Sequence, residues 1–342
     1  MRVDDFTFDL PADQVAQSPA ESREASRLMV LDRRRRAAAT GEFVDIVDEF
    51  AAGDVLVLND TRVFPARLFG RKATGGRIEL LLVRQLGAGQ EWLCMVRSSK
   101  APKAGSVIVI DELLSATVVE REDGRYWRVR FCCAGDFFAH VEKIGRMPLP
   151  PYIRREDTVS DRDRYQTVFA RESGSVAAPT AGLHFTEHIL GKLRAKGVEI
   201  HFLTLHVGPG TFMPVQVENI AEHRMHSEIF TVPRKTAEAV NLAKREKRRV
   251  TAVGTTTTRT LEYFVNDNGE LKSGSGESDL FIYPGFRFRI IDALVTNFHL
   301  PKSTLLMLVC AFGGADFVLE AYRKAIAEGF RFYSYGDCML IK

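Results

Sequence analysis

Cysteine is scarce in this chain and is not spaced for either of its two common structural roles. The five cysteines are Cys94, Cys132, Cys133, Cys310 and Cys338, an odd number, and no two of them form a CxxC pair. That pattern argues against a disulfide framework and against a structural zinc site. It suits a reducing compartment, so we expect a cytoplasmic protein.

Long apolar runs are also missing. The longest covers residues 305–312 and falls far short of the roughly 18 residues that cross a bilayer. The first residues, MRVDDFTFDLPAD, lack the apolar core of a signal peptide. We therefore expect no membrane anchor.

The chain has neither a strong charge nor a phosphate-binding fingerprint. Its 47 Lys and Arg residues against 44 Asp and Glu residues leave a net charge of +3, which allows a polyanionic partner without requiring one. No GxxxxGKS/T motif occurs, and no GxGxxG follows a predicted strand. These absences disfavour nucleoside triphosphate chemistry and dinucleotide cofactors.

What the chain does contain is a change of texture along its 342 residues. Residues 1–62 and 151–342 alternate strand and helix patterns, which is typical of a mixed or parallel sheet flanked by helices. Residues 67–131 instead carry about six short β-rich runs with no helical pattern between them. We expect an α/β domain into which a small all-β barrel domain, residues 63–150, is inserted.

Four segments that follow predicted strands share an unusual mixture of Gly or Pro with His, Thr or Asn. They are AAPTAGLHFT at 177–186, LHVGPGTFMPV at 205–215, VGTTTTRTLE at 253–262 and TNFHLPKSTLL at 296–306. Ligands of open α/β sheets bind outside the carboxyl ends of the strands. We therefore expect the four segments to line one pocket.

Histidines gather in the same region. Seven of the eight lie between positions 184 and 299, and His184, His206 and His299 fall inside the strand-end segments. Histidine suits proton transfer because its pKa lies near neutral pH. Each of the three is either a catalytic group or a structural one, and the sequence leaves that choice open.

A metal centre is the alternative use of these side chains. His184 with His188, and His223 with His226, have spacings that could place two imidazoles on one helix face. The first pair reads HFTEH, however, so the glutamate of an HExxH metalloprotease motif is not in its place. We expect no metal.

The run of four threonines after Gly254 is predicted to begin a helix at Thr255 or Thr256. Backbone N–H groups and hydroxyls at such a start can hold a carboxylate or another anion. Arg259 and Glu262 are three residues apart, so they share a helix face. The alternative is a helix cap with an ion pair on the surface.

Three further features carry two interpretations each. Residues 59–62 (NDTR) stand at another strand end. They are either a hinge turn or part of the pocket. Glu228 is either a catalytic base or a half-exposed strand residue. Residues 234–249 hold seven positive and two negative side chains. This segment is either a solvated helix face or a surface that contacts phosphates.

Nine motifs are spread along essentially the whole chain. They are FDLP at 8–11, LNDTRVFPARL at 58–68, PLPPYI at 148–153, GSVAAPTAGLHFT at 174–186, HVGPGTFMPV at 206–215, HSE at 226–228, VGTTTTRTLE at 253–262, LVTNFHLPKSTLLMLVCAF at 294–312 and YSYGDCMLI at 333–341. In these motifs the chain resembles the S-adenosylmethionine:tRNA ribosyltransferase-isomerases of queuosine biosynthesis.

The resemblance implies a reaction. The ribosyl part of S-adenosylmethionine moves to the 7-aminomethyl-7-deazaguanine wobble base of a tRNA with a GUN anticodon and rearranges there to epoxyqueuosine. Adenine and methionine leave. The resemblance also implies S-adenosylmethionine as a co-substrate, no metal, and an α/β domain with an inserted β-barrel. We expect a monomer.

On this resemblance we consider His206 or Glu228 as the base and His184 or His299 as the acid. The threonine run with Arg259 would hold the carboxylate or the ribose hydroxyls of the co-substrate, and Asp60 and Arg62 would face the target base. The predicted substrate-binding residues are Asn59, Asp60, Arg62, Thr180, Gly182, Gly208, Gly210, Thr211, Gly254, Thr255, Thr256, Arg259, Glu262 and Asn297.

The barrel together with the basic segment 234–249 is expected to clamp the tRNA stem. Two other functions stay open at this point. One is a metal-dependent hydrolase built on the histidines, and the other is a non-catalytic RNA-binding protein that uses the barrel. The dense polar loops at the strand ends argue against the second, because a pure binder needs no such pocket.

Overall fold

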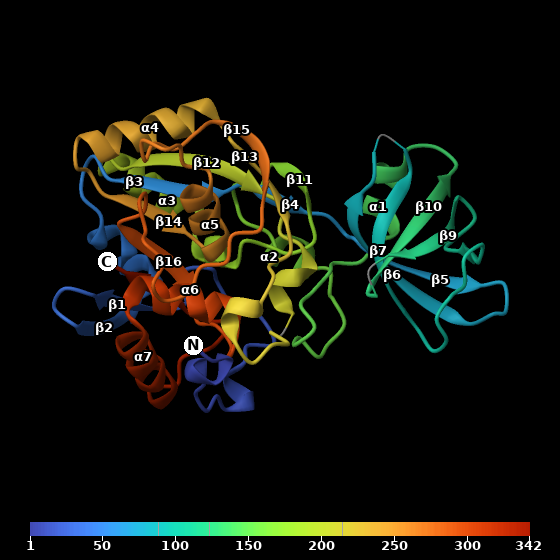
Figure 1. Cartoon of the computed structure of the whole chain (residues 1–342), viewed down its shortest axis with the longest axis horizontal. Helices are drawn as coiled ribbons and strands as arrows, with labels where there is room; N and C mark the ends of the chain where they lie inside the picture. The colour runs from blue at the N-terminus through green and yellow to red at the C-terminus, as the bar shows by residue number, and fades with distance from the viewer. Residues whose placement is uncertain (88, 123, 214) are drawn as a thin grey trace.

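The computed structural model describes residues 1–87, 89–122, 124–213 and 215–342, so Pro214 of the 205–215 segment lies outside the described residues. Figure 1 shows a large α/β lobe, which carries both ends of the chain, and a smaller all-β lobe beside it. The two lobes match the two textures of the sequence.

A sheet of nine strands forms the centre of the α/β lobe. In spatial order these are β15 (Gly274–Ser278), β13 (Glu228–Val232), β12 (Glu199–Leu205), β3 (Val55–Asn59), β14 (Val250–Val253), β16 (Ala293–Asn297), β17 (Cys338–Ile341), β1 (Arg27–Asp32) and β2 (Ala37–Glu42). The four strands from β12 to β16 run parallel to one another, and antiparallel strands flank them. The predicted mixed sheet is confirmed.

Helices cover both faces of this sheet because its central strands are apolar on both sides. All five residues of β3 (VLVLN) are buried. Val55 and Val57 pack toward α4 (Arg234–Arg245), α5 (Thr255–Tyr263), α6 (Thr304–Gly313) and α7 (Ala315–Ala327). Leu56 and Leu58 pack toward α3 (Glu187–Ala195) and η3 (Phe43–Glu49). Alternate residues of a strand point to opposite faces, so one run of apolar residues serves two cores.

The smaller lobe is a closed barrel of six strands. They are β5 (Arg67–Lys72), β6 (Arg77–Gln85), β7 (Glu91–Ser98), β8 (Val107–Val109), β9 (Leu114–Glu122) and β10 (Tyr126–Cys133), and α1 (Phe137–Ile144) follows them. Along the strands, buried residues alternate with partly exposed ones, as a barrel with a filled interior requires. The predicted barrel is confirmed, and its boundaries at 62/63 and 150/151 stay a prediction.

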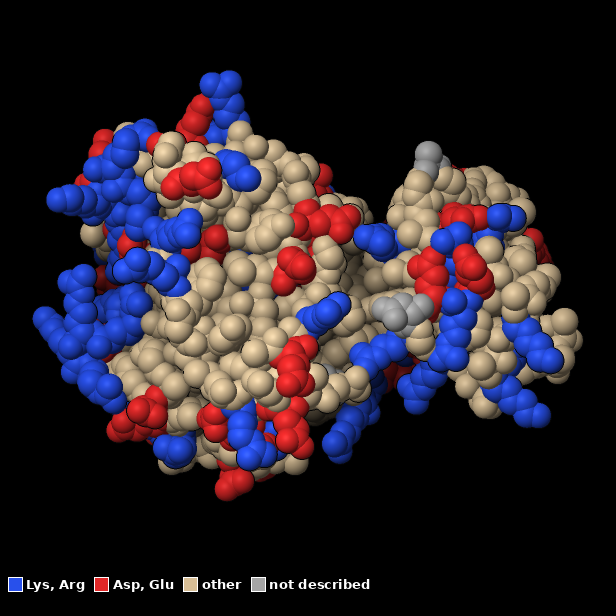
Figure 2. Space-filling view, viewed as in Figure 1, with Lys and Arg blue, Asp and Glu red and all other residues tan. Residues whose placement is uncertain are grey.

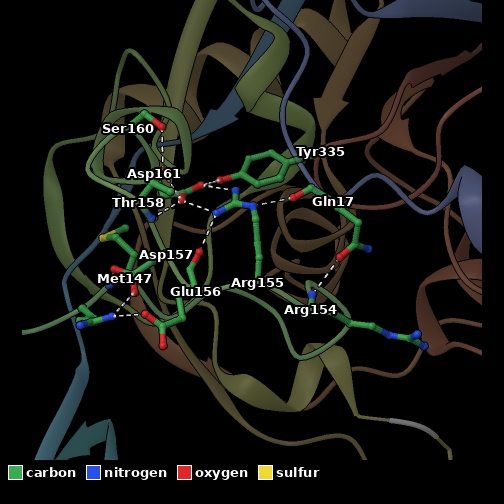
Figure 3. Close-up of polar contacts among 11 residues, drawn as sticks. Gln17, Met147, Arg154, Arg155, Glu156, Asp157, Thr158, Ser160, Asp161 and Tyr335 are labelled. Carbon is green, nitrogen blue, oxygen red and sulfur yellow. Dashed lines mark hydrogen bonds and ion pairs between the residues drawn. The ribbon is translucent and has the colours of Figure 1, made fainter.

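The chain enters the barrel after β4 (Thr61–Val63) and returns through β11 (Glu172–Ser175), which pairs with β4 in parallel. Figure 3 shows how the returning segment is anchored. Arg155 donates to both oxygens of Asp161, at 2.7 and 2.8 Å, and the Tyr335 hydroxyl donates to Asp161 at 2.8 Å. Burial raises the pKa of Asp161, but these hydrogen bonds outweigh it and hold the pKa well below its usual range.

Two sequence expectations fail near the C-terminus. We predicted the last strand near residues 331–335, but that segment is a turn and the last strand is β17. Tyr333 has a φ of 76°, and Asp337 accepts hydrogen bonds from the N–H groups of Arg331 and Arg27, at 2.7 and 2.9 Å. The aromatic residues there favour strand by propensity, and tertiary contacts override it.

The helix expected to be capped by Asp316 begins at Ala315, two residues earlier than that cap implies. Gly314, with a φ of 86°, precedes it, and Asp316 lies in its first turn. Within the described residues, no single helix is long and apolar enough to cross a membrane. The pair α6 and α7 passes that test by length and composition only, and it is bent by 114° at its break.

Candidate active site

The site candidates meet at one edge of the sheet. Asn59, Val253 and Asn297 end the parallel strands β3, β14 and β16 there. The neighbouring antiparallel strand β13 begins at the same edge with Glu228, and Ser26 precedes β1. The chain also leaves for the barrel from this edge, directly after β3. The predicted convergence of the strand-end segments is therefore found in the structure.

The first hollow at this edge, here called the threonine pocket, is narrow, with a volume of about 40 Å³. It is lined by parts of all four predicted segments. The predicted residues in its lining are Thr180, Thr211, Gly254, Thr255, Thr256, Asn297 and His299. Tyr333 and Ser334 also line it and were missed by the sequence reasoning. The signal for them was the YSYGD motif, whose turn we predicted as a strand.

The threonine run divides into two sets on α5, which begins at Thr255 as predicted. Thr257, Thr258 and Thr260 turn their hydroxyls to the backbone carbonyls four residues earlier, at 2.7, 3.1 and 3.1 Å. Thr255 and Thr256 line the threonine pocket. Gly254 begins the helix with a φ of 91°, a conformation that glycine adopts without strain.

Arg259 pairs with Glu228 and not with Glu262. Its Nη1 donates to Glu228 at 2.7 Å and its Nε donates to the Leu280 carbonyl at 2.9 Å. The second oxygen of Glu228 accepts from the Gly208 N–H at 3.1 Å. Both charged side chains are buried, so neither the surface ion pair nor the half-exposed glutamate, our alternative interpretations, is found.

His206 is held at the end of β12 by Thr61, whose Oγ1 lies 2.8 Å from His206 Nδ1. Burial lowers the pKa of His206, and the nearby carboxylates of Glu172 and Asp60 oppose that shift. Gly174 packs against the ring so closely that an added Cβ would lie 2.9 Å from His206 Cε1. Thr61 was missed as a site residue, although it stands within the NDTR motif.

His184 and His299 are fully buried. His184 has Ser26 Oγ at 2.9 Å from Nδ1 and Asn297 Oδ1 at 3.3 Å from Nε2. His299 Nε2 lies 2.9 Å from Thr296 Oγ1. Burial lowers the pKa of His184 to about 4 and that of His299 to about 3, so both are neutral at pH 7.

Several predicted site residues do not line the threonine pocket. Arg62 is exposed and contacts Glu142 of α1 at 3.2 Å. Gly182 packs against Thr167 and Phe169. Glu262 accepts hydrogen bonds from three backbone N–H groups, of residues 289–291, at 2.7, 3.0 and 2.9 Å. The structure gives these three residues local structural contacts.

Two further predicted residues, Asn59 and Asp60, lie where the chain passes from the α/β lobe to the barrel. The side chain of Asn59 donates to the Leu205 carbonyl at 3.0 Å and accepts from the Thr61 N–H at 3.1 Å. Asp60 accepts from Thr204 Oγ1 at 2.7 Å and from Arg171 at 3.1 Å. Both interpretations of the NDTR segment thus have support, since it shapes the exit to the barrel and also positions His206 through Thr61.

The histidine pairs considered for a metal do not share a helix face as predicted. His184 lies in η4 (Thr180–His184) and is buried, whereas His188 lies in α3, is exposed and has Glu24 at 3.4 Å. Among residues 1–87, 89–122, 124–213 and 215–342, no three His, Cys, Asp or Glu side chains are grouped so that they could hold a metal ion.

Comparisons with known proteins agree with this architecture. A family model described as "Queuosine biosynthesis protein" matches residues 3–341. The S-adenosylmethionine:tRNA ribosyltransferase-isomerases of Syntrophotalea carbinolica and Geobacter metallireducens are 60% and 54% identical, over 100% of both chains in each case. The crystal structure of an S-adenosylmethionine tRNA ribosyltransferase from Thermotoga maritima is 39% identical, with a TM-score of 0.57, and covers 99% of this chain and 100% of its own. This chain belongs to the queuosine biosynthesis protein family.

Proposed function

We propose that the chain transfers the ribosyl group of S-adenosylmethionine to the 7-aminomethyl-7-deazaguanine wobble base of a tRNA with a GUN anticodon and isomerises it. The product is epoxyqueuosine, and adenine and methionine are released. The observation that carries the proposal is the meeting of the predicted loops in adjoining pockets at one sheet edge. The enzyme acts as a cytoplasmic monomer and needs no metal.

Membership of this family makes the chain an enzyme. The alternative of a non-catalytic RNA-binding protein is therefore wrong. The names of the relatives support both S-adenosylmethionine and tRNA as substrates.

The first chemical demand is a base, because the sulfonium acidifies the neighbouring C5′ proton. We assign His206, the only one of the four catalytic candidates that is not fully buried. The Thr61 hydroxyl donates its proton to the Glu172 carbonyl, 3.4 Å away. Its oxygen therefore accepts a hydrogen bond from His206, whose proton sits on Nδ1. That tautomer leaves Nε2 with a lone pair for the proton. Glu228 is less suited, since both of its oxygens already accept hydrogen bonds.

The second demand is a donor that helps adenine leave. Both ring nitrogens of His184 are engaged by Ser26 and Asn297, whereas His299 uses one nitrogen on Thr296 and lines the threonine pocket. We assign His299 as the donor to adenine and His184 as the residue that positions Asn297. Because burial keeps His299 neutral at pH 7, the donor is an imidazole N–H.

The target base reaches the pockets through the interlobe groove, a hollow of about 610 Å³ between the barrel and the returning segment. Figure 2 shows the surface hollowed between the two lobes. The groove is lined by the exposed ring of Phe69 and by arginines that include Arg97, Arg146 and Arg154. Aromatic rings and arginines suit the unstacked bases and phosphates of an anticodon loop.

The tRNA contact proposed here does not use segment 234–249. Figure 1 places α4 at the end of the α/β lobe away from the barrel. In this proposal the barrel and the arginines of the interlobe groove contact the tRNA.

One incubation tests the function. The protein, S-adenosylmethionine and a tRNA that carries the deazaguanine base should yield free adenine and a nucleoside of the epoxyqueuosine mass. The same tRNA with guanine at the wobble position is the control and should yield neither. His206→Gln should lower turnover at least tenfold with an unchanged melting temperature. Methyl transfer without adenine release would contradict the proposal.

A further inference from the structure

A second hollow adjoins the threonine pocket and is built by both lobes. This arginine pocket has a volume of about 380 Å³, and the two pockets share Thr211 in their linings. Arg125 comes from the barrel, Arg224 from the segment before β13, and Arg259 from α5. Glu222 and Glu228 also line it. A ligand that begins in the threonine pocket can therefore extend into a pocket rich in guanidinium groups.

Arg259 carries a donor that the protein does not use. Its Nη1 and Nε are bonded to Glu228 and to the Leu280 carbonyl. Its Nη2 is buried and has no hydrogen-bond partner among the described residues, and the whole residue is only 3% exposed. A buried donor without an acceptor costs about 1–3 kcal/mol, and native structures seldom leave one. An acceptor supplied by a ligand accounts for it.

The surroundings specify the charge of that acceptor. Glu228 holds one edge of the Arg259 guanidinium, which fixes the direction of the free N–H group. Arg125 is itself held toward the pocket by Gln216, at 2.6 Å. With Arg224 in the same lining, these guanidinium groups favour an anionic acceptor, and a carboxylate oxygen can accept from the free Nη2. The carboxylate of Glu222 in the same lining suits an ammonium group beside it.

We infer that the arginine pocket binds the α-amino acid end of a ligand, with its carboxylate on Nη2 of Arg259. The inference rests on the proposed function, in which that ligand is S-adenosylmethionine. The methionine end lies in the arginine pocket, and the nucleoside end points toward the threonine pocket across the shared Thr211. Because Arg125 belongs to the barrel, both lobes take part in binding the co-substrate.

Two unreactive thioethers test the inference, because only one of them carries an α-amino acid group. S-adenosylhomocysteine carries the α-amino acid, and 5′-methylthioadenosine ends in a methyl group instead. Calorimetric titration of the wild type should show tighter binding of S-adenosylhomocysteine. The double variant Arg259→Gln with Glu228→Gln leaves no unpaired buried charge. It should bind S-adenosylhomocysteine at least tenfold more weakly and 5′-methylthioadenosine within twofold of the wild type.

A matched control is Arg248→Gln with Glu199→Gln. This pair also makes one ion pair, at 2.9 Å, but at the opposite edge of the sheet. It should change neither affinity. If the Arg259 double variant does not melt cooperatively, Arg259→Lys replaces it, because lysine keeps a charge for Glu228 and lacks Nη2.

The outcomes separate the inference from the function. Unchanged binding of S-adenosylhomocysteine by the double variant overturns the inference, and so does an equal loss of both ligands. A loss of tRNA affinity alone would mean that the pocket takes an RNA phosphate, which also overturns it. A wild type that binds neither thioether nor S-adenosylmethionine contradicts the proposed function itself.

Discussion

Burial decides the protonation state of His184 and His299. Their hydrogen-bond partners are hydroxyls and an amide, not carboxylates. No anionic partner therefore offsets the lost hydration, and the pKa falls to about 4 for His184 and about 3 for His299. Both rings pack as neutral groups at the edge of the sheet.

The consequence is a loss of stability in acid. An unfolded histidine has a pKa near 6.5, so below that pH the unfolded chain binds more protons than the native one until the native pKa is reached. Stability should fall by about 2 kcal/mol per histidine between pH 7 and pH 5. Urea unfolding of the wild type and of His184→Asn at both pH values measures this. The variant should lose about 2 kcal/mol less than the wild type, and equal losses would show that His184 is charged in the native state.

Gly174 tests the position of His206 at the same scale. Its φ of +151° and the 2.9 Å approach to His206 leave no room for a methyl group. Gly174→Ala should displace the ring from Thr61 and lower turnover at least tenfold. Gly191→Ala is the control, since Gly191 lies in α3 with no atom within 4 Å of an added Cβ. It should raise stability by up to about 1 kcal/mol without changing turnover. Wild-type turnover in Gly174→Ala would remove His206 as the base.

At the scale of elements, α5 has a structural side and a pocket side. Three of its threonines bond backbone carbonyls one turn earlier, and two line the threonine pocket. The middle of the same helix carries Arg259, which lines the neighbouring pocket. One short helix thus serves both pockets, and its position is fixed by Gly254 at the end of β14.

Isosteric replacements should distinguish the two sides of α5. Thr257→Val removes a buried hydroxyl that bonds the Val253 carbonyl, so it should cost about 1 kcal/mol of stability and leave KM for S-adenosylmethionine unchanged. Thr256→Val should instead raise that KM several-fold with little change in stability. Denaturant unfolding and steady-state kinetics measure the two effects. A raised KM in Thr257→Val alone would reverse the assignment.

At the scale of the whole molecule, the basic side chains form two separate groups. Figure 2 shows lysines and arginines gathered at the end of the α/β lobe away from the barrel. Arg33, Arg34, Lys244 and Lys247 belong to this group. The other group lines the interlobe groove, beside the proposed route of the target base. Only the second group lies where an anticodon loop would also reach the pockets.

The two groups should therefore differ in their effect on tRNA binding. Arg97→Gln with Arg154→Gln removes two charges from the groove, so tRNA affinity should fall and the slope of log K against log salt should shrink by about 1.5. Arg34→Gln with Lys247→Gln removes two exposed charges at the far end and should change neither quantity. Filter binding over a series of salt concentrations measures both. Equal effects of the two double variants would contradict the groove as the contact.

Features that depend on a few neighbouring residues were predictable from the sequence. The short strands of the barrel and the helix start after Gly254 are both confirmed. The meeting of the polar loops was predictable as well, because parallel strands end at a common edge. The family followed from motifs in the same loops.

Only the tertiary structure decided which side chains meet. Arg259 pairs with Glu228, 31 residues away, because β13 begins at the edge where α5 starts. His184 is neutral because the fold buries it, beside Ser26 before β1 and Asn297 at the end of β16. Segment 234–249 is basic by sequence, yet its helix α4 packs on β12, β3 and β14 and lies away from the barrel (Figure 1). Periodicity and capping act within a few residues, whereas partners, burial and charge placement depend on the order of strands in the sheet.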